Sequence, residues 1–160
     1  MISNVWCRQM KQAFCVFNLT RESFLGLHVT PADTMFGRLR GLLGRIKFAP
    51  EDGIWLIPSF GIHTFGMLFP VDLVYLDEAK RVIHVVEHLG PFRISPIRPG
   101  CASLLEVRTR TIYSSRTRIG DRLLICSPEE MQAHLGDTAR SSSADKSKGG
   151  QVCSGISWRP

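Results

Sequence analysis

The polar side chains that could do chemistry in this sequence are concentrated in one apolar stretch. GIHTFGMLFPVDLVYLD, residues 61–77, places His63, Thr64 and Asp72 among aliphatic and aromatic residues. The pKa of a histidine lies near neutrality, so its ring can accept or donate a proton. A carboxylate among apolar neighbours is costly to bury unless donors satisfy it, and such groups serve either as structural ties or as functional groups in clefts. The stretch therefore admits two interpretations, a site and a structural tie.

Glu106, in the apolar run SLLEV, is a second carboxylate of the same kind. If it met His63 and Asp72, the three would form an acid/base cluster able to activate water or bind a cation. That is the hydrolase-like alternative, and nothing in the spacing forces the three together. Otherwise we expect Glu106 to pair with Arg45 or with an arginine of the 108–118 segment.

The structural interpretation follows from alternation along an extended chain. It places His63 on one face with Phe65 and Met67, which is typical of a half-buried, hydrogen-bonded histidine. It places Thr64 on the opposite face, where we expect it to bond to a neighbouring strand. Asp72 is expected to face inward and to fix a neighbouring loop by accepting bonds from backbone N–H groups or an arginine.

Recognised catalytic and metal-binding patterns are absent from the sequence. It contains no GxSxG, HExxH, GxGxxG or phosphate-loop motif. The five cysteines include no CxxC pair, so neither a zinc ribbon nor a redox motif is predicted, and the thiols are interpreted as reduced packing residues. We therefore expect no metal and no cofactor.

The charge balance permits weak contact with negatively charged partners, but no specific nucleic acid is expected. The formal net charge is +6, which permits weak attraction to nucleic acid or to anionic lipid. Arg45, Arg93 and Arg108 are the candidate anion-binding residues. Five arginines lie between residues 108 and 122, but no nucleic-acid-binding motif accompanies them. Weak nucleic-acid contact through this cluster, Arg108–Arg122, is the second alternative function, and it predicts an affinity that falls steeply with salt.

The surrounding pattern predicts a mainly β fold, a compact small sandwich or barrel of about 7–8 strands with one short helix. The helix is expected at about 31–43, with Thr30 as its N-cap and Pro31 at its first position. Turns are expected at 77–80 and at 118–121, where Gly120 can take a positive φ. A long loop is expected at 88–100. Apolar runs bounded by Gly, Pro and polar residues predict the strands at 13–19, 24–29, 53–58, 62–67, 71–76, 81–87, 103–107 and 122–127.

The chain length suits one domain with appendages. We expect a flexible N-terminus at 1–11, one β-rich domain at 12–130 and a disordered Ser/Lys/Gly-rich tail at 131–160, where few core-forming residues occur. No apolar run is long enough to span a membrane, and no signal peptide is recognisable at the start. The sequence thus predicts a cytoplasmic protein, and we expect a monomer.

Three blocks resemble the family called domain of unknown function 192. They are RLRGLLGR at 38–45, IHTFGMLFPVDLVYLD at 62–77, and SLLEV at 103–107 followed by RIGDRL at 118–123. The resemblance implies a compact β domain with one short helix, and it implies no agreed activity. Many similar proteins carry export signals or lipid anchors. This chain departs from the family pattern at Leu68, where an arginine is usual, and at Arg110 and Arg116, where glycine is frequent.

The leading interpretation is a non-catalytic β domain that binds a small ligand or a partner protein, as an accessory to envelope or secretion processes. It depends on a polar trio inside an apolar β segment without a catalytic motif. The candidate polar site comprises His63, Thr64, Asp72 and Glu106.

Overall fold

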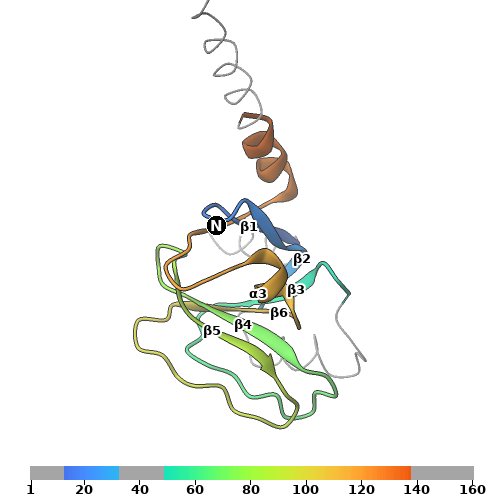
Figure 1. Ribbon diagram of the computed structural model, residues 1–160, viewed down its shortest axis with the longest axis vertical. Coiled ribbons are helices and arrows are strands. Elements are labelled where there is room, and N and C mark those ends of the chain that lie inside the picture. The colour runs from blue at the N-terminus through green and yellow to red at the C-terminus, as the bar shows by residue number, and fades with distance from the viewer. Residues whose placement is uncertain (1–12, 33–48, 138–160) are drawn as a thin grey trace, which may run out of the picture. The chain divides into compact units, whose positions relative to one another are not determined.

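The protein is mainly β, as the sequence predicts. The computed structural model describes residues 13–32 and 49–137. Seven strands form one curled sheet, a half-barrel, in the order β5-β4-β6-β3-β2-β1-β7 (Figure 1). A five-residue helix, α3, spans Thr111–Ser115. The strands are β1 (Phe14–Asn18), β2 (Ser23–Ala32), β3 (Asp52–Leu56), β4 (Val71–Leu76), β5 (Val82–Leu89), β6 (Ser103–Arg108) and β7 (Leu123–Cys126).

All the strands belong to one compact unit, Met1–Pro128, and a second unit begins at Glu129. A helix covers residues 128–137. It includes residues 131–137, the first part of the segment that was predicted to be disordered. The sequence MQAHL at 131–135 contains good helix formers, which the low content of core-forming residues does not reveal. Residues 138–160 and the N-terminal segment 1–11 lie outside the described residues.

Most neighbouring strands pair antiparallel, and β2 with β3 is a parallel pair. The two edge strands approach each other at one end of the sheet. An isolated bridge joins Arg81 to Arg122, and the N–H of Val82 donates to the carbonyl of Asp121 at 2.8 Å. These bonds give the half-barrel its curl, since they connect the start of β5 with the segment before β7.

β4 lies in the middle of the apolar core, and all six of its residues are buried. Its alternation divides the core into two clusters. Leu73 and Tyr75 pack in one cluster with Leu104 of β6, and Val74 and Leu76 pack in the other with Leu105 and Val107. The period of two along the strand therefore sends successive side chains to opposite faces of the sheet.

Two predicted elements are wrong in part. Residues 62–67 form no strand; they contain a turn in which the N–H of Met67 donates to Thr64, and Gly66 takes a φ of 84°. β2 continues through Thr30 and Pro31 to Ala32, so the helix predicted from residue 31 does not begin there. Pairing with β3 outweighs the capping pattern, which is local. The remainder of that prediction, 33–43, lies outside the described residues.

α3 was not expected from the sequence. Arg110 and Arg116 flank it, with φ angles of 74° and 55°. Both angles lie in the left-handed region that glycine adopts most readily. This chain adopts that conformation at both positions with arginine.

Candidate functional site

Asp72 is a structural tie between segments far apart in the chain. Its side chain is fully buried in β4. One carboxylate oxygen accepts the N–H of His88 at 2.9 Å and the other accepts the N–H of Ile112 at 3.1 Å. The carboxylate therefore fixes the end of β5 and the start of α3 to β4, as expected of a loop-fixing group. Two backbone donors supply the compensation that burial requires.

Glu106 is also buried, but it does not meet Asp72. In the β4–β6 register Asp72 lies opposite Val107, and Glu106 lies opposite Leu73. Directly paired residues share a face and successive residues alternate. The carboxylates of Asp72 and Glu106 thus point to opposite faces of the sheet, and the acid/base cluster of the hydrolase-like alternative does not form among the described residues. Arg45, one of the partners proposed for Glu106 beside the arginines of the 108–118 segment, lies outside the described residues.

His63 is exposed, so the prediction of a half-buried core histidine is wrong. It forms an isolated bridge with Ile94, and its ring stacks on Phe65 with centroids 5.2 Å apart. Because residues 62–67 form a turn rather than a strand, the alternation argument does not apply to them. Asp72 lies buried on the sheet while His63 lies on an exposed loop, and no contact joins them in the described part of the chain.

Thr64 is fully buried and holds two loops together. Its hydroxyl donates to the carbonyl of Gly90 at 2.8 Å and accepts the N–H of Arg93 at 2.8 Å. Its own N–H donates to the carbonyl of Arg93. The expected bond to a neighbouring strand is therefore a set of bonds to the loop that follows β5.

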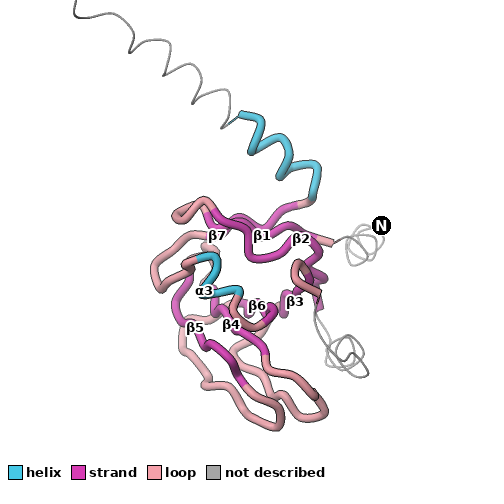
Figure 2. Tube along the Cα trace, turned by 45° about the vertical axis from the view of Figure 1, so that its right-hand side comes forward, coloured by secondary structure: helices cyan, strands magenta, loops and turns pink. Residues whose placement is uncertain are grey.

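We call residues 57–70 the first loop, residues 90–102 the second loop, and the two together the loop pair. They run side by side along much of their length. The N–H of Phe92 donates to Thr64, the N–H of Ser95 donates to Ile62, and the hydroxyl of Ser95 accepts the N–H of Ile62. In Figures 1 and 2 the loop pair lies at the end of the half-barrel away from β1 and β7.

The loop pair exposes an unusual amount of apolar surface. Among the described residues, six of the eleven large exposed apolar side chains lie on it. Their exposed fractions range from 51% to 75%, so each side chain is more than half in solvent. We call this set the apolar loop surface: Phe60, Phe65, Leu68, Phe92, Ile94 and Ile97. Soluble monomers rarely gather so many large apolar groups in one place without a binding role.

The charges on the loop pair are positive. Its sequence contains Arg93 and Arg98, both exposed, and no Asp or Glu. Arg98 is hydrogen-bonded to the ring of His84 at 3.0 Å. Burial, followed by the charge of Arg98, lowers the pKa of His84. A neutral His84 can accept the guanidinium N–H, so this contact helps to fix the second loop to β5.

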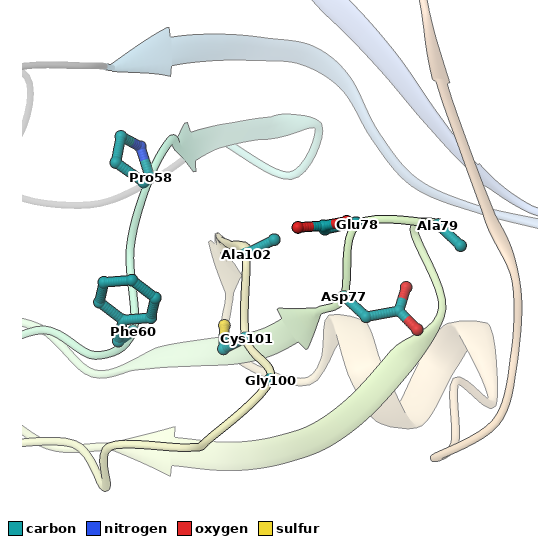
Figure 3. Close-up of a pocket in the computed structure, with 8 residues that line it drawn as sticks. All are labelled: Pro58, Phe60, Asp77, Glu78, Ala79, Gly100, Cys101 and Ala102. Atoms are coloured by element: carbon teal, nitrogen blue, oxygen red, sulfur yellow. The ribbon is translucent and has the colours of Figure 1, made fainter.

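A depression lies at the base of the loop pair. Its volume is about 680 Å³. Figure 3 shows Pro58 and Phe60 on one side, the turn with Asp77 and Glu78 on the other, and Cys101 between them. The Cys101 thiol donates to the carbonyls of Ser59 or Ser103, and burial raises its pKa. A thiol with a raised pKa is a poor nucleophile at neutral pH, so Cys101 is not poised as a nucleophile in the depression.

A second polar centre, Asp121, escaped sequence reasoning. It is buried and accepts bonds from Asn18 at 2.9 Å, from the Arg118 N–H at 2.9 Å and from Arg21 at 3.2 Å. Burial alone would raise the pKa of this carboxyl, but the bonds from Asn18, Arg118 and Arg21 together lower it. The signal available was the turn RIGD, in which an aspartate follows Gly120; the partner asparagine lies 103 residues away.

The arginines expected to bind anions are exposed where the structure describes them. Arg93 lies on the second loop. Arg108 is the last residue of β6, and Arg110 and Arg116 flank α3. Within residues 13–32 and 49–137, no group of three or more His, Cys, Asp or Glu side chains is arranged to hold a metal ion. No helix in this part of the chain has the length and apolar character needed to cross a membrane.

Comparison with known proteins places this geometry in a family. The model of domain of unknown function 192, described as an uncharacterized ACR, matches residues 17–125. The chain belongs to this family. A relative from Thermococcus sibiricus, named UPF0127 protein, is 27% identical over 115 residues, which cover 68% of this chain and 72% of the relative.

Two solved structures share the fold. A putative transcription regulator from Sinorhizobium meliloti superposes with a TM-score of 0.61 at 20% identity, over 71% of this chain and 92% of the other. A protein of unknown function from Novosphingobium aromaticivorans gives 0.60 at 16% identity, over 70% and 83% of the two chains. At these identities the likeness establishes the fold alone.

Proposed function

We propose that this protein is a non-catalytic binding domain that docks through the apolar loop surface onto a partner presenting apolar groups beside negative charge. The observation that carries the proposal is the concentration of six exposed apolar side chains on the loop pair. A surface of this kind in a protein of ordinary composition is typical of a docking site. Arg93 and Arg98, without a carboxylate on either loop, supply the complementary charge.

The buried polar residues support a structural rather than a catalytic role. Asp72 and Glu106 point to opposite faces of the sheet, and Asp72 already accepts two backbone N–H groups. A catalytic base must reach the proton that it abstracts. The rival hydrolase-like function therefore lacks its constellation within the described residues.

The form of the surface favours a macromolecular partner over a small ligand. Small-ligand sites are concave and enclose most of their ligand, whereas these side chains are each more than half exposed. The depression at the base of the loop pair includes only Phe60 of the six. An accessory role in envelope or secretion processes stays a prediction.

The test is an NMR titration of the ¹⁵N-labelled protein with three soluble eight-carbon amphiphiles: octanoate, octyl glucoside and octylammonium. We expect octanoate to shift the amides of residues 60–68 and 92–97 most, and octylammonium least. Ile119→Ser, which removes an exposed apolar side chain near another turn, is the matched control and should leave the shifts unchanged. Shifts spread over the whole sheet, or none with octanoate, would contradict the proposal.

A further inference from the structure

We propose that the partner surface is an anionic phospholipid bilayer, into whose interface the loop pair inserts. The inference rests on the proposed function and names its partner. The part that enters first is the tip of the loop pair, formed by Phe65, Leu68, Phe92 and Ile94, around the Thr64–Met67 turn. Figures 1 and 2 show the loop pair at one end of the half-barrel, away from β1 and β7.

The exposed apolar side chains of the tip suit a fluid lipid bilayer better than a rigid protein partner. Binding energy at protein interfaces comes from side chains that fit pockets on a partner with close shape complementarity. A bilayer interface accepts protruding Phe, Leu and Ile side chains of any arrangement and gains free energy in proportion to the apolar area buried. Leu68 and Ile94 are 74% and 71% exposed, so both can enter such a phase without rearrangement.

Several main-chain N–H groups of the tip are already hydrogen-bonded within the protein. Polar main-chain groups enter lipid at high cost unless they are bonded within the protein. Here the N–H groups of Thr64, Met67, Phe92 and Arg93 all have partners inside the loop pair. The hydroxyl of Thr64 is buried in the same network. These four N–H groups can therefore leave water without losing a hydrogen bond.

The charge pattern selects an anionic surface. Arg93, which is exposed and lies between Phe92 and Ile94 in the chain, brings positive charge to the tip, and Arg98, bonded to His84, adds a second charge to the same loop. Basic residues near an anionic leaflet each add about 1 kcal/mol of attraction. A second copy of this chain would oppose arginine to arginine. The carboxylates of Asp77 and Glu78 lie beside Phe60 at the depression, on the side of the loop pair away from the tip turn.

The experiment is cosedimentation of the full chain with vesicles of phosphatidylcholine alone and of equimolar phosphatidylcholine and phosphatidylglycerol. We expect the protein to pellet with the anionic vesicles and to dissociate as salt rises. The double variant Phe65→Ser/Phe92→Ser should lower the partition coefficient by at least tenfold, since about 1.4 kcal/mol corresponds to tenfold and a buried Phe contributes more than that. Arg93→Gln should lower it about fivefold.

Matched control variants distinguish insertion of the tip from nonspecific adsorption of the protein to vesicles. Ile119→Ser and Arg118→Gln remove an exposed apolar and an exposed basic residue elsewhere and should leave the partition coefficient unchanged. Circular dichroism of each variant confirms folding, which is expected because all these side chains are exposed. Equal loss in tip and control variants, or no binding to the anionic vesicles, would overturn the inference.

The two proposals can fail separately. If octanoate shifts the tip amides but the vesicles pellet no protein, the binding surface stands and the bilayer is the wrong partner, leaving an acidic, apolar protein segment. If octanoate does not shift the tip amides and the anionic vesicles do not bind the protein, both the bilayer proposal and the proposed function fail.

Discussion

Single residues in this domain illustrate how a polar group in an apolar stretch is explained by its partners. Asp72 reads as a possible catalytic carboxylate in the sequence, but its two oxygens are both used by backbone N–H groups from β5 and α3. His63, nine residues earlier, is exposed on a loop. Their separation shows that closeness in sequence carried no information about a shared site here.

Replacing Asp72 by asparagine tests the tie. We expect Asp72→Asn to lower the free energy of unfolding by about 2 kcal/mol, because an amide NH₂ must now face one of the two buried N–H donors. Chemical denaturation measures the change, and Glu87→Gln, an exposed carboxylate on β5, is the control with no expected effect. An unchanged midpoint for Asp72→Asn would show that the carboxylate is not a structural tie.

Asp121 gives a prediction for pH. Its pKa in the folded protein lies below the ordinary value of 3.8, because the bonds from Asn18, Arg118 and Arg21 outweigh the effect of burial. A depressed carboxyl pKa stabilises the fold above the unfolded value, and that contribution is lost as the pH falls through the folded pKa. We therefore expect the melting temperature of the wild type to fall more steeply below pH 4 than that of Asp121→Asn.

The measurement is differential scanning calorimetry of both proteins between neutral pH and the lowest pH at which each is folded. At neutral pH Asp121→Asn should be the less stable protein, and the difference should narrow on acidification. Parallel curves for the two proteins would refute the assigned role of Asp121.

At the scale of elements, turns position the loop pair and the contact between the two edges of the half-barrel. Gly120 has a φ of 93° just before β7, where the N–H of Gly120 donates to Val82 and connects the sheet edges. An added Cβ at Gly120 would meet no atom within 4 Å. Any effect of alanine there must come from the backbone conformation.

We expect Gly120→Ala to destabilise the protein by about 1–2 kcal/mol, since a side chain in the left-handed region is strained. Gly90→Ala is the matched control: its Cβ also meets open space, but its φ is not in the left-handed region. That variant should be neutral or slightly more stable. Denaturant unfolding of both proteins decides the matter, and equal effects would show that strain at Gly120 is unimportant.

For the whole molecule, the arrangement of charge and apolar surface predicts its state of association. The formal net charge is +6, and the loop pair carries arginines without carboxylates. Docking of two copies through this surface would bring like charges together in a desolvated contact.

We expect light scattering coupled to size-exclusion chromatography to give the mass of one chain at low salt. Arg93→Gln should also give the mass of one chain in dilute solution. At high protein concentration this variant should associate more than the wild type, because the repulsion between the arginines is removed. A stable dimer of the wild type at low salt, abolished by Phe65→Ser/Phe92→Ser, would reassign the apolar loop surface to self-association.

The sequence by itself determined most of the strands, although the local signals for a helix from residue 31 and for a strand at 62–67 were misleading. The strands from β3 to β7 follow from apolar runs and turn residues, and the buried, loop-fixing role of Asp72 follows from the cost of burying a carboxylate. The family was recognisable because its residues 62–77 form one continuous segment. These conclusions need no knowledge of which strands are neighbours.

Only the tertiary structure decided which polar groups meet. The β4–β6 register sends Asp72 and Glu106 to opposite faces, and this register depends on pairing between residues 27 to 37 positions apart. Likewise, the apolar loop surface exists because Thr64 and Ser95 bind together two loops that are separate in the chain. Long-range pairing of this kind is set by the packing of the whole sheet, so no local pattern in the sequence encodes it.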